Sequence, residues 1–351
     1  MITLCTLFNT NYIDKGLTMY ESIERYTQDY VLYVLCMDDR CYEILTNLNR
    51  PRFIPIKLSD FESPELLAVK QERSMGEYCW TCSSCLVDYV MRTFNPEYCA
   101  YIDSDLYFYD DVNVVVKEMQ ERNASVMITG HRFNWYDRKE MEWMVGKYCV
   151  EFNTFKNDEN GRSLLTTWKN QCLEYCKCDG DGVHWGDQKY MDDWCDKYEF
   201  CVETENLGAG VAHWNISQYK LKDEDEYGPT SIICKGNIYR PFFYHYQNIK
   251  YLSDTVADSN TSEYLYVDYN LVKSFCRHYL SHVRTVKNML KNVYGIDFII
   301  KAHPGYNFKR KSLMERVKSI CNIGYIKKRV RYRIFHKLPS FLNQNKGLVE
   351  F

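Results

Sequence analysis

The sequence of 351 residues predicts an α/β fold built on a mostly parallel sheet. Its first half alternates short apolar runs with longer segments whose apolar residues recur at helical spacing, as in strands that alternate with helices. Hydrophobic residues make up 46% and charged residues 26% of the chain, as in ordinary globular proteins. We expect a domain boundary in the polar stretch Leu252–Ser262, which gives an α/β domain over residues 1–255 and a helical, basic region over residues 256–351.

The expected elements follow in order along the chain. Apolar runs of strand length are Ile2–Phe8, Val31–Cys36, Phe53–Leu58, Cys99–Ile102, Ser125–Thr129 and Ile238–Tyr246. Segments with apolar residues three or four positions apart are Asp14–Tyr26, Arg40–Leu48, Glu77–Phe94, Val112–Glu121, Asp158–Cys176 and Gly186–Trp194. The first group predicts strands and the second predicts helices. From Ser262 onward the pattern is helical and increasingly basic.

Charge is distributed unevenly along the chain. Residues 301–351 contain 13 Lys and Arg against two Glu, while the net charge of the whole chain is −3. A basic tail on an acidic body predicts an anionic partner for the tail, and basic residues interleaved with apolar ones favour an amphipathic segment on an anionic membrane surface. A solvated basic helix packed on the body is the alternative. Nucleic acid is not an expected partner, because the body is acidic and no recognised module is present.

The expected location is the cytoplasm, with peripheral attachment to the inner membrane face. The N-terminal residues lack the features of a signal peptide, and no apolar run approaches the roughly 20 residues of a membrane span. The 16 cysteines are scattered, so free buried thiols are expected. The alternative is metal ligation by Cys79, Cys82 and Cys85, although on a helix these residues merely drift along one face.

Two carboxylates, Asp103 and Asp105, directly follow the apolar run Cys99–Ile102. A strand that leads to them would place both at the carboxyl end of the sheet, where open α/β sheets bind ligands. Carboxylate oxygens suit Mg²⁺ or Mn²⁺, ions that typically bridge to a substrate's phosphates. The pair therefore predicts a metal site, with an acidic turn as the alternative.

Three more stretches can join this pair. Asn9-Thr-Asn11-Tyr12 follows the first strand, at the edge where a nucleotide base sits in doubly wound folds, although a capped turn explains it equally well. Asp187 and Gln188 could face the cleft near a sugar, or they could cap a helix. The Gly-containing turn Asn206–Gly210 offers a backbone that a substrate could approach closely, although two glycines alone are a weak signal.

A fourth stretch, His245 to Lys250, ends a predicted strand. A histidine there can complete a metal site with two carboxylates, and a nearby lysine can neutralise a diphosphate. A structural histidine is the alternative.

In combination these residues resemble the GT-A glycosyltransferases, in the order found in glycosyltransferase family 8. A closer resemblance is to bacterial glycosyltransferases of polysaccharide gene clusters, which share the pattern of Glu77-Tyr-Cys-Trp-Thr81, Asp103-Ser-Asp-Leu-Tyr-Phe108, Phe155-Lys-Asn-Asp158 and Gly186-Asp-Gln-Lys-Tyr-Met-Asp-Asp-Trp194. The resemblance covers roughly residues 1–250 and implies a Rossmann-like GT-A domain. The chain departs from family 8 at Asn248, where that family has glycine, and Lys250 lies one residue earlier than the family lysine.

The resemblance also implies roles for individual residues. The implied Mn²⁺ or Mg²⁺ ligands are Asp103, Asp105 and His245. The implied donor-binding residues are Phe8, Asn9, Asn11, Tyr12, Ser104 and Lys250, in addition to the two aspartates. The implied catalytic residues, beside the transferred sugar, are Asp187 and Gln188.

The function implied by this resemblance is hexose transfer from a nucleotide-diphosphate sugar, with UDP favoured, to a surface-polysaccharide or lipid-linked glycan acceptor. A retaining reaction is expected, and Asp187 would be the first candidate for a base if the reaction inverts. A nucleotidyltransferase is disfavoured, because no Gly-rich basic loop follows Phe8. The remaining alternatives are a cysteine-ligated metalloprotein and a membrane-docking scaffold without transferase activity.

Overall fold

The computed structural model describes residues 1–298 and 347–351. The chain forms two compact units, each assembled from several segments. The first unit comprises Met1–Arg132, Lys139–Gly210 and Arg240–His245. The second comprises Phe133–Arg138, Val211–Tyr239 and Tyr246–Phe351.

A seven-stranded sheet forms the centre of the first unit, in the order β3-β2-β1-β4-β7-β6-β8. Its strands are β1 (Ile2–Phe8), β2 (Tyr30–Cys36), β3 (Phe53–Lys57), β4 (Tyr98–Ile102), β6 (Val126–Gly130), β7 (Tyr148–Lys156) and β8 (Cys201–Glu203). The first four strands run parallel, and β8 is parallel to β6. The predicted mostly parallel sheet is therefore confirmed. β7 was not among the expected strands, and it runs antiparallel to both β4 and β6.

Helices alternate with these strands along the chain. Their bounds are α1 (Ile13–Tyr26), α2 (Asp39–Leu48), α3 (Leu58–Phe61), α4 (Pro64–Lys70), α5 (Met75–Phe94), α6 (Val114–Glu121), α7 (Arg138–Val145), α8 (Glu159–Glu174) and α9 (Trp194–Lys197). α5 begins two residues before its predicted start, because Ser74 and Glu77 form a reciprocal capping box. Its last residue is Phe94, and the next residue, Asn95, adopts the left-handed conformation that ends the helix.

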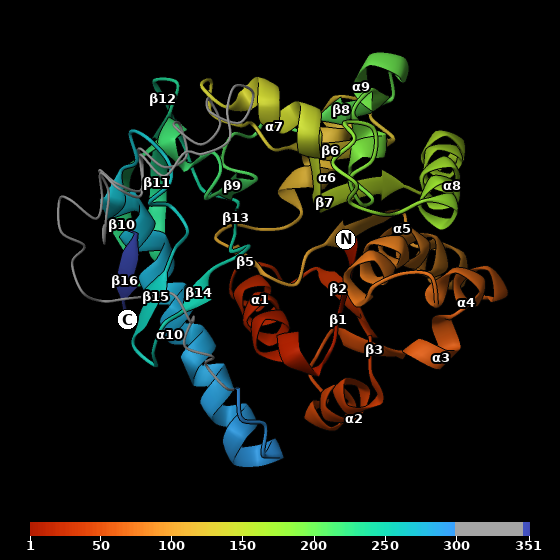
Figure 1. The fold of residues 1–351 in the computed structure, drawn as a ribbon, viewed down its shortest axis with the longest axis horizontal. Helices are drawn as coiled ribbons and strands as arrows, with labels where there is room; N and C mark the ends of the chain where they lie inside the picture. The colour runs from red at the N-terminus through yellow and green to blue at the C-terminus, as the bar shows by residue number, and fades with distance from the viewer. Residues whose placement is uncertain (299–346) are drawn as a thin grey trace, which may run out of the picture. The chain divides into compact units, whose positions relative to one another are not determined.

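Every residue of β1 is buried, because helices cover both faces of the sheet. Cys5 and Leu7 share one core cluster with Leu86 of α5. On the opposite face Phe8 packs against Gly16 of α1. Figure 1 shows α1 and α5 on either side of β1 and β2. Parallel strands read as continuous apolar runs when both of their faces are covered in this way.

Two expected elements differ from the structure. The segment Ile238–Tyr246 forms two strands, β12 (Asn237–Tyr239) and β13 (Phe243–His245), rather than one. Residues 186–194 form a turn and the short 3₁₀ helix η2 (Lys189–Met191) instead of one helix. Gly186 has a φ of 55°, a left-handed conformation that does not continue a helix.

The second unit contains small antiparallel sheets and one long helix. Its strands include β10 (Tyr219–Asp225), β11 (Gly228–Cys234), β14 (Lys250–Tyr251), β15 (Val256–Asp258) and β16 (Leu348–Glu350). α10 (Tyr269–Tyr294) is amphipathic and ends at Gly295. Among the described residues, no helix is both long enough and apolar enough to cross a membrane. The basic segment expected to contact a membrane lies almost wholly outside the described residues.

The close contact between Gly16 and Phe8 predicts an asymmetry between two glycines. A Cβ at Gly16 would lie 2.3 Å from Phe8 Cε1, whereas a Cβ at Gly76 in the first turn of α5 meets nothing within 4 Å. Gly16→Ala should lower the free energy of unfolding by about 1–3 kcal/mol through overpacking. Gly76→Ala should leave it unchanged or raise it by up to about 1 kcal/mol. Urea titration measures both, and a Gly16→Ala protein as stable as the wild type would contradict the packing argument.

Candidate functional site

The turn after β4 carries the two predicted carboxylates. Its backbone is attached to the neighbouring strand, because Asp103 N donates to Glu151 O of β7 over 2.9 Å. Ser104 and Asp105 complete the turn, and the short strand β5 (Leu106–Phe108) follows at once. Both carboxylates therefore lie at the carboxyl end of β4, the edge at which the sequence predicts them.

β5 determines where the predicted histidine lies. It pairs antiparallel with β13, so that His245 stands opposite Leu106, the residue after Asp105. His245 Nε2 is 3.0 Å from Asp105 Oδ1 and 3.6 Å from Asp103 Oδ2. The structure thus brings all three predicted metal ligands together, although 140 residues separate Asp105 from His245.

These groups strongly perturb one another. Removal from water raises the pKa of Asp103 to about 7, and the like charges of Asp105 and Glu151 add to this, while His245 opposes it. Burial disfavours the charged form of His245, but Asp105 and its other partners raise the pKa of the imidazole well above its usual value. Burial opposes the ionised form of Asp105, but the charge and the hydrogen bond of His245 hold the pKa of this carboxyl below its usual value. Several acidic groups around one imidazole favour an additional cation.

The three side chains fit a divalent metal ion. One ligand atom from each of Asp103, Asp105 and His245 can be chosen so that all lie within 4.8 Å of one another. The Asp103 side chain is 31% exposed, so the group is open on one side. Carboxylates suit Mg²⁺ and Mn²⁺, and an imidazole in the set favours Mn²⁺ over Mg²⁺.

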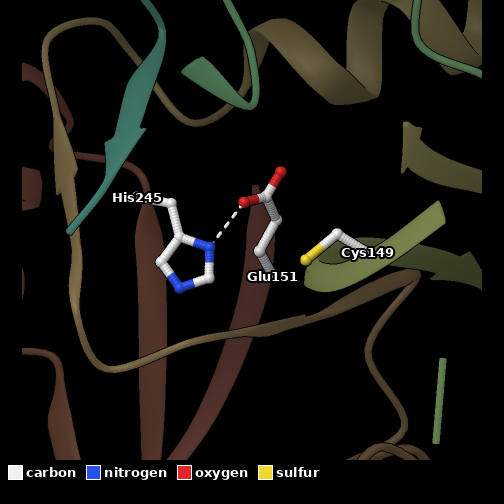
Figure 2. A group of neighbouring side chains, drawn as sticks. All are labelled: Cys149, Glu151 and His245. Atoms are coloured by element: carbon white, nitrogen blue, oxygen red, sulfur yellow. Dashed lines mark hydrogen bonds and ion pairs between the residues drawn. The ribbon is translucent and has the colours of Figure 1, made fainter. Parts of the chain in front are cut away.

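Glu151 was not predicted from the sequence, and it contacts the other side of the imidazole. Its side chain is fully buried on β7, and its Oε2 lies 2.6 Å from His245 Nδ1. Figure 2 shows the carboxylate facing the ring, with Cys149 beside it. Cys149, Glu151 and His245 form a second group that could hold a metal ion, so His245 belongs to both groups.

The position of Glu151 follows from the two-residue period of β7. Cys149, Glu151 and Asn153 share one face of the strand. Asn153 is fully buried, donates to Cys149 O over 3.1 Å and accepts from Thr129 N over 3.1 Å, beside the irregular pairing of β6 with β7. Polar residues at alternate positions within Tyr148–Phe155 were the available signal, and the sequence analysis did not use it.

The loop after β1 is held by an aspartate that the sequence analysis also missed. Asp38 follows β2, caps α2 through Cys41 N at 2.7 Å, and accepts from Thr10 N at 2.8 Å and Thr10 Oγ1 at 2.6 Å. These hydrogen bonds keep the pKa of Asp38 below its usual value, although burial opposes them. The capping position before α2 was a readable signal.

Within this loop the predicted base-binding residues differ in exposure. Tyr12 is 45% exposed and ends the 3₁₀ helix η1 (Thr10–Tyr12), while Asn9 Oδ1 accepts from Asn11 N over 3.0 Å. Phe8 is buried in the core, so its side chain is not part of an open site. Tyr12 and Asn11 therefore offer the accessible side chains.

Lys15 connects this loop with the metal group. Its Nζ lies 4.0 Å from the centre of the Tyr12 ring, and its charge helps to lower the pKa of Asp105. Lys15 was not predicted from the sequence. Its position three residues after Tyr12 was a usable signal, because residues three apart lie about one helical turn from each other.

Asp187 and Gln188 lie at the turn before η2. Asp187 is 4% exposed, and its Oδ2 accepts from Ser83 of α5 over 2.6 Å. Burial raises the pKa of Asp187 to about 7, and the charge of Asp103 contributes. Gln188 Nε2 donates to Val145 O over 2.7 Å, so both side chains are already bound within the first unit.

The glycines of Asn206–Gly210 allow close packing. A Cβ at Gly208 would lie 2.1 Å from Arg240 O, and Gly208 O accepts from Phe242 N over 2.8 Å, directly before β13. The turn thus supports the strand that carries His245. Lys250 belongs to the second unit, where it is exposed on β14.

The described cysteines are free thiols, in agreement with the expectation for them. Cys82 and Cys85 are buried on α5, and burial raises the pKa of both thiols. Among the described residues, the groups of three or more clustered potential metal ligands include none of Cys79, Cys82 and Cys85. The geometry therefore favours a packing role for these cysteines over a role as metal ligands.

No protein-family model matches the chain. It is 28% identical over 287 residues to the uncharacterised protein YfnD of Bacillus subtilis strain 168, an alignment that covers 76% of this chain and 86% of YfnD. It is 25% identical over 292 residues to the uncharacterised protein YfnF of the same strain, covering 80% of this chain and 94% of YfnF.

Among solved structures, mouse xyloside xylosyltransferase 1 aligns with a TM-score of 0.45 and 10% identity, over 71% of this chain and 98% of that one. The galactosyltransferase LgtC aligns with a TM-score of 0.39 and 12% identity, over 60% of this chain and 74% of that one. The glycosyltransferase GlyE of Streptococcus pneumoniae TIGR4 aligns with a TM-score of 0.39 and 13% identity, over 60% of this chain and 46% of that one. Likenesses at this level assign no family, and we infer function from the side chains of the site.

The two roles of Asp38 predict a local effect of its loss. Asp38→Ala removes a helix cap and the anchor of Thr10, so it should lower the free energy of unfolding by about 1–2 kcal/mol and speed hydrogen exchange at the Thr10 amide. Asp158→Ala is the matched control, because Asp158 also caps a helix, through Gly161 N, and also accepts from one hydroxyl, Ser125. It should cost similar stability without changing exchange at Thr10, as measured by urea titration and amide-exchange NMR. Unchanged protection of Thr10 in Asp38→Ala would contradict the anchoring role.

Proposed function

We propose that this chain is a metal-dependent GT-A glycosyltransferase. It transfers a hexose from a nucleotide-diphosphate sugar, with UDP as the favoured nucleotide, to a surface-polysaccharide or lipid-linked glycan acceptor. The observation that carries the proposal is the convergence of Asp103, Asp105 and His245 at the carboxyl edge of the central sheet. That edge is where nucleotides bind in open α/β folds.

The ligand set favours Mn²⁺. When bound between Asp103, Asp105 and His245, the ion would stabilise negative charge on the departing nucleoside diphosphate. Lys15 supplies a second positive charge close to Asp105, and its ammonium group would stabilise the same diphosphate. A role for Lys250 in holding the diphosphate stays a prediction.

The loop after β1 offers the donor its base-binding surface. The half-exposed ring of Tyr12 provides a face on which a base can stack, and Asn11 provides a side-chain amide. Thr10 is held by Asp38, so the loop is ordered before the donor arrives. Order of this kind reduces the entropy lost on binding.

The surroundings of Asp187 favour a retaining reaction. An inverting enzyme needs a base that reaches the acceptor hydroxyl. Asp187, the predicted candidate, is 4% exposed and is hydrogen-bonded to Ser83. In its ionised form this carboxylate is better placed to stabilise an oxocarbenium-like sugar from within the site. Gln188 would help to orient the same sugar.

The acceptor would meet the donor at the inner face of a membrane, where lipid-linked glycans are extended. This part of the proposal rests on the basic tail, whose 13 Lys and Arg fall within residues 301–351. Such a segment binds anionic lipid headgroups through its charge.

Removal of the two carboxylates tests the proposal directly. We expect UDP to bind the wild-type protein in a Mn²⁺-dependent manner in calorimetric titrations. Asp103→Asn/Asp105→Asn should weaken this binding by at least about 100-fold, more than the 10–100-fold cost typical of a lost second-shell partner. The matched control is Asp223→Asn/Asp225→Asn, because this pair has the same spacing but lies on β10 in the second unit.

The outcomes separate the proposed function from its alternatives. Metal-dependent binding of GDP or TDP instead of UDP would change the nucleotide but keep the transferase. If none of these nucleotides binds with Mn²⁺ or Mg²⁺, the transferase is excluded, and a metalloprotein or a scaffold takes its place. Equal losses in the two double variants would show that the effect is not specific to the site.

The pH dependence of metal binding gives a separate prediction. Without metal, Asp103 has a pKa raised to about 7 and His245 is cationic, so a metal ion must displace protons from both. Mn²⁺ affinity should therefore fall as pH drops through 7, by about tenfold per pH unit for each proton displaced. Calorimetry between about pH 5.5 and 8.5, in buffers of different ionisation enthalpy, counts these protons. An affinity independent of pH would contradict the proposed ligand set.

A further inference from the structure

Glu151 is a fully buried acidic residue in the middle of a central strand. Burial of an ionised carboxylate costs several kcal/mol unless a partner compensates it. The hydrogen-bond partner of its side chain is His245, whose Nδ1 lies 2.6 Å from Oε2. Its other oxygen, Oε1, is buried and has no hydrogen-bond partner among the described residues. A carboxylate kept only for stability would normally have both oxygens satisfied.

The two nitrogens of His245 face different partners. Nδ1 meets Glu151, while Nε2 meets Asp105 at 3.0 Å and Asp103 at 3.6 Å. A neutral imidazole carries one proton, so a proton held on Nδ1 by an ionised carboxylate leaves a lone pair on Nε2. Nε2 is the ring nitrogen next to both aspartates, so its lone pair would be available to an ion held by them.

The surroundings keep this carboxylate in its place. A Cβ at Gly210 would lie 2.7 Å from Glu151 Oε1, so the absence of a side chain there leaves room for the carboxylate. Gly210 has a φ of +63°, which glycine adopts without strain. Asn153, two residues along the same strand, holds the local backbone through Cys149 O and Thr129 N. The strand therefore holds the backbone beside Glu151, and Gly210 leaves the space that the carboxylate occupies.

The neighbouring Cys149 raises an alternative, because Cys149, Glu151 and His245 could themselves hold a metal ion. A thiol ligates metals as the thiolate. Burial and the charge of Glu151 raise the pKa of the Cys149 thiol, so a metal ion bound there would have to displace a proton from it. The short contact between Glu151 and His245 already satisfies the nitrogen that such a site would need. The geometry favours a hydrogen bond over a second metal site.

We propose that Glu151 is a positioning residue for His245: it accepts the Nδ1 proton, fixes the ring and its tautomer, and directs Nε2 to the ion held with Asp103 and Asp105. This inference rests on the metal-dependent function proposed above. Carboxylates commonly support metal-bound histidines in this way, and loss of such a partner typically costs 10–100-fold in metal affinity.

The test measures metal binding and ligation rather than turnover. In the full-length protein with Mn²⁺ and UDP, electron spin-echo modulation should detect a histidine nitrogen bound to Mn²⁺, and His245→Ala should lose it. Glu151→Gln keeps the shape and removes the charge, so Mn²⁺ affinity should fall about 10-fold. Glu151→Ala should lower the affinity by up to about 100-fold and weaken the nitrogen signal.

Two control variants separate positioning from other effects. Glu62→Gln removes another largely buried carboxylate, which bonds Tyr78 and Lys70 far along the chain from the site residues, and it should leave Mn²⁺ affinity unchanged. Cys149→Ala should change the affinity less than about threefold if the thiol is only a neighbour. A loss as large as that of Glu151→Gln would favour the Cys149, Glu151 and His245 metal site and overturn the positioning role.

A measurement on the wild-type protein covers the case in which the Glu151 variants do not fold. With Mg²⁺ and UDP bound at about pH 8, ¹⁵N NMR should find the His245 proton on Nδ1, and a proton on Nε2 would overturn the inference. If the wild type binds Mn²⁺ through a histidine nitrogen but both Glu151 variants match it in affinity and signal, only the role of Glu151 fails. If the wild type shows no bound nitrogen, the proposed metal site fails as well.

Discussion

The pairing of β5 with β13 is the interaction on which the site depends. β5 has three residues and starts directly after Asp105, while β13 ends at His245. Their antiparallel register sets His245 beside the two aspartates across 140 residues of chain. Phe108 and Phe243, opposite each other in this pairing, are both fully buried, and Phe108, Phe152 and Phe243 pack in mutual contact. Burial of these aromatic rings stabilises the strand pairing that positions His245.

This arrangement concentrates negative charge at one edge of the sheet. Asp103, Asp105 and Glu151 surround a single imidazole, and their repulsion contributes to the raised pKa of Asp103. Such a group weakens the folded state when no cation is present and strengthens it when one is bound. In the proposed function, this local cost in stability would be offset when the metal ion binds.

Several of the candidate side chains are held by a residue from another element. Asp38 after β2 holds Thr10 after β1, Ser83 of α5 holds Asp187, and Glu151 of β7 holds His245. Each contact fixes a group before any ligand binds, which is the condition for electrostatic stabilisation at little reorganisation cost. The supporting residues come from the rigid sheet and its helices, while the groups they hold lie in turns or at strand ends.

The sequence predicted the elements that depend on local pattern. The strand Ile2–Phe8, the helix before Asn95 and the acidic turn at Asp103 all have signals within a few residues. Glu151 was missed although polar residues alternate along its strand, because that strand was not recognised and its partner lies 94 residues away. The prediction of a helix over Gly186–Trp194 was wrong because Gly186 is left-handed and because the Asp187 side chain is bound by Ser83 of another element. Residues that carry chemistry are visible as motifs, whereas the residues that orient them are specified by tertiary contacts. Glu151 shows why residues of the second kind must be found from a structure. The alternation of polar residues along its strand can indicate which face it lies on, but its role is apparent only when His245 is beside it.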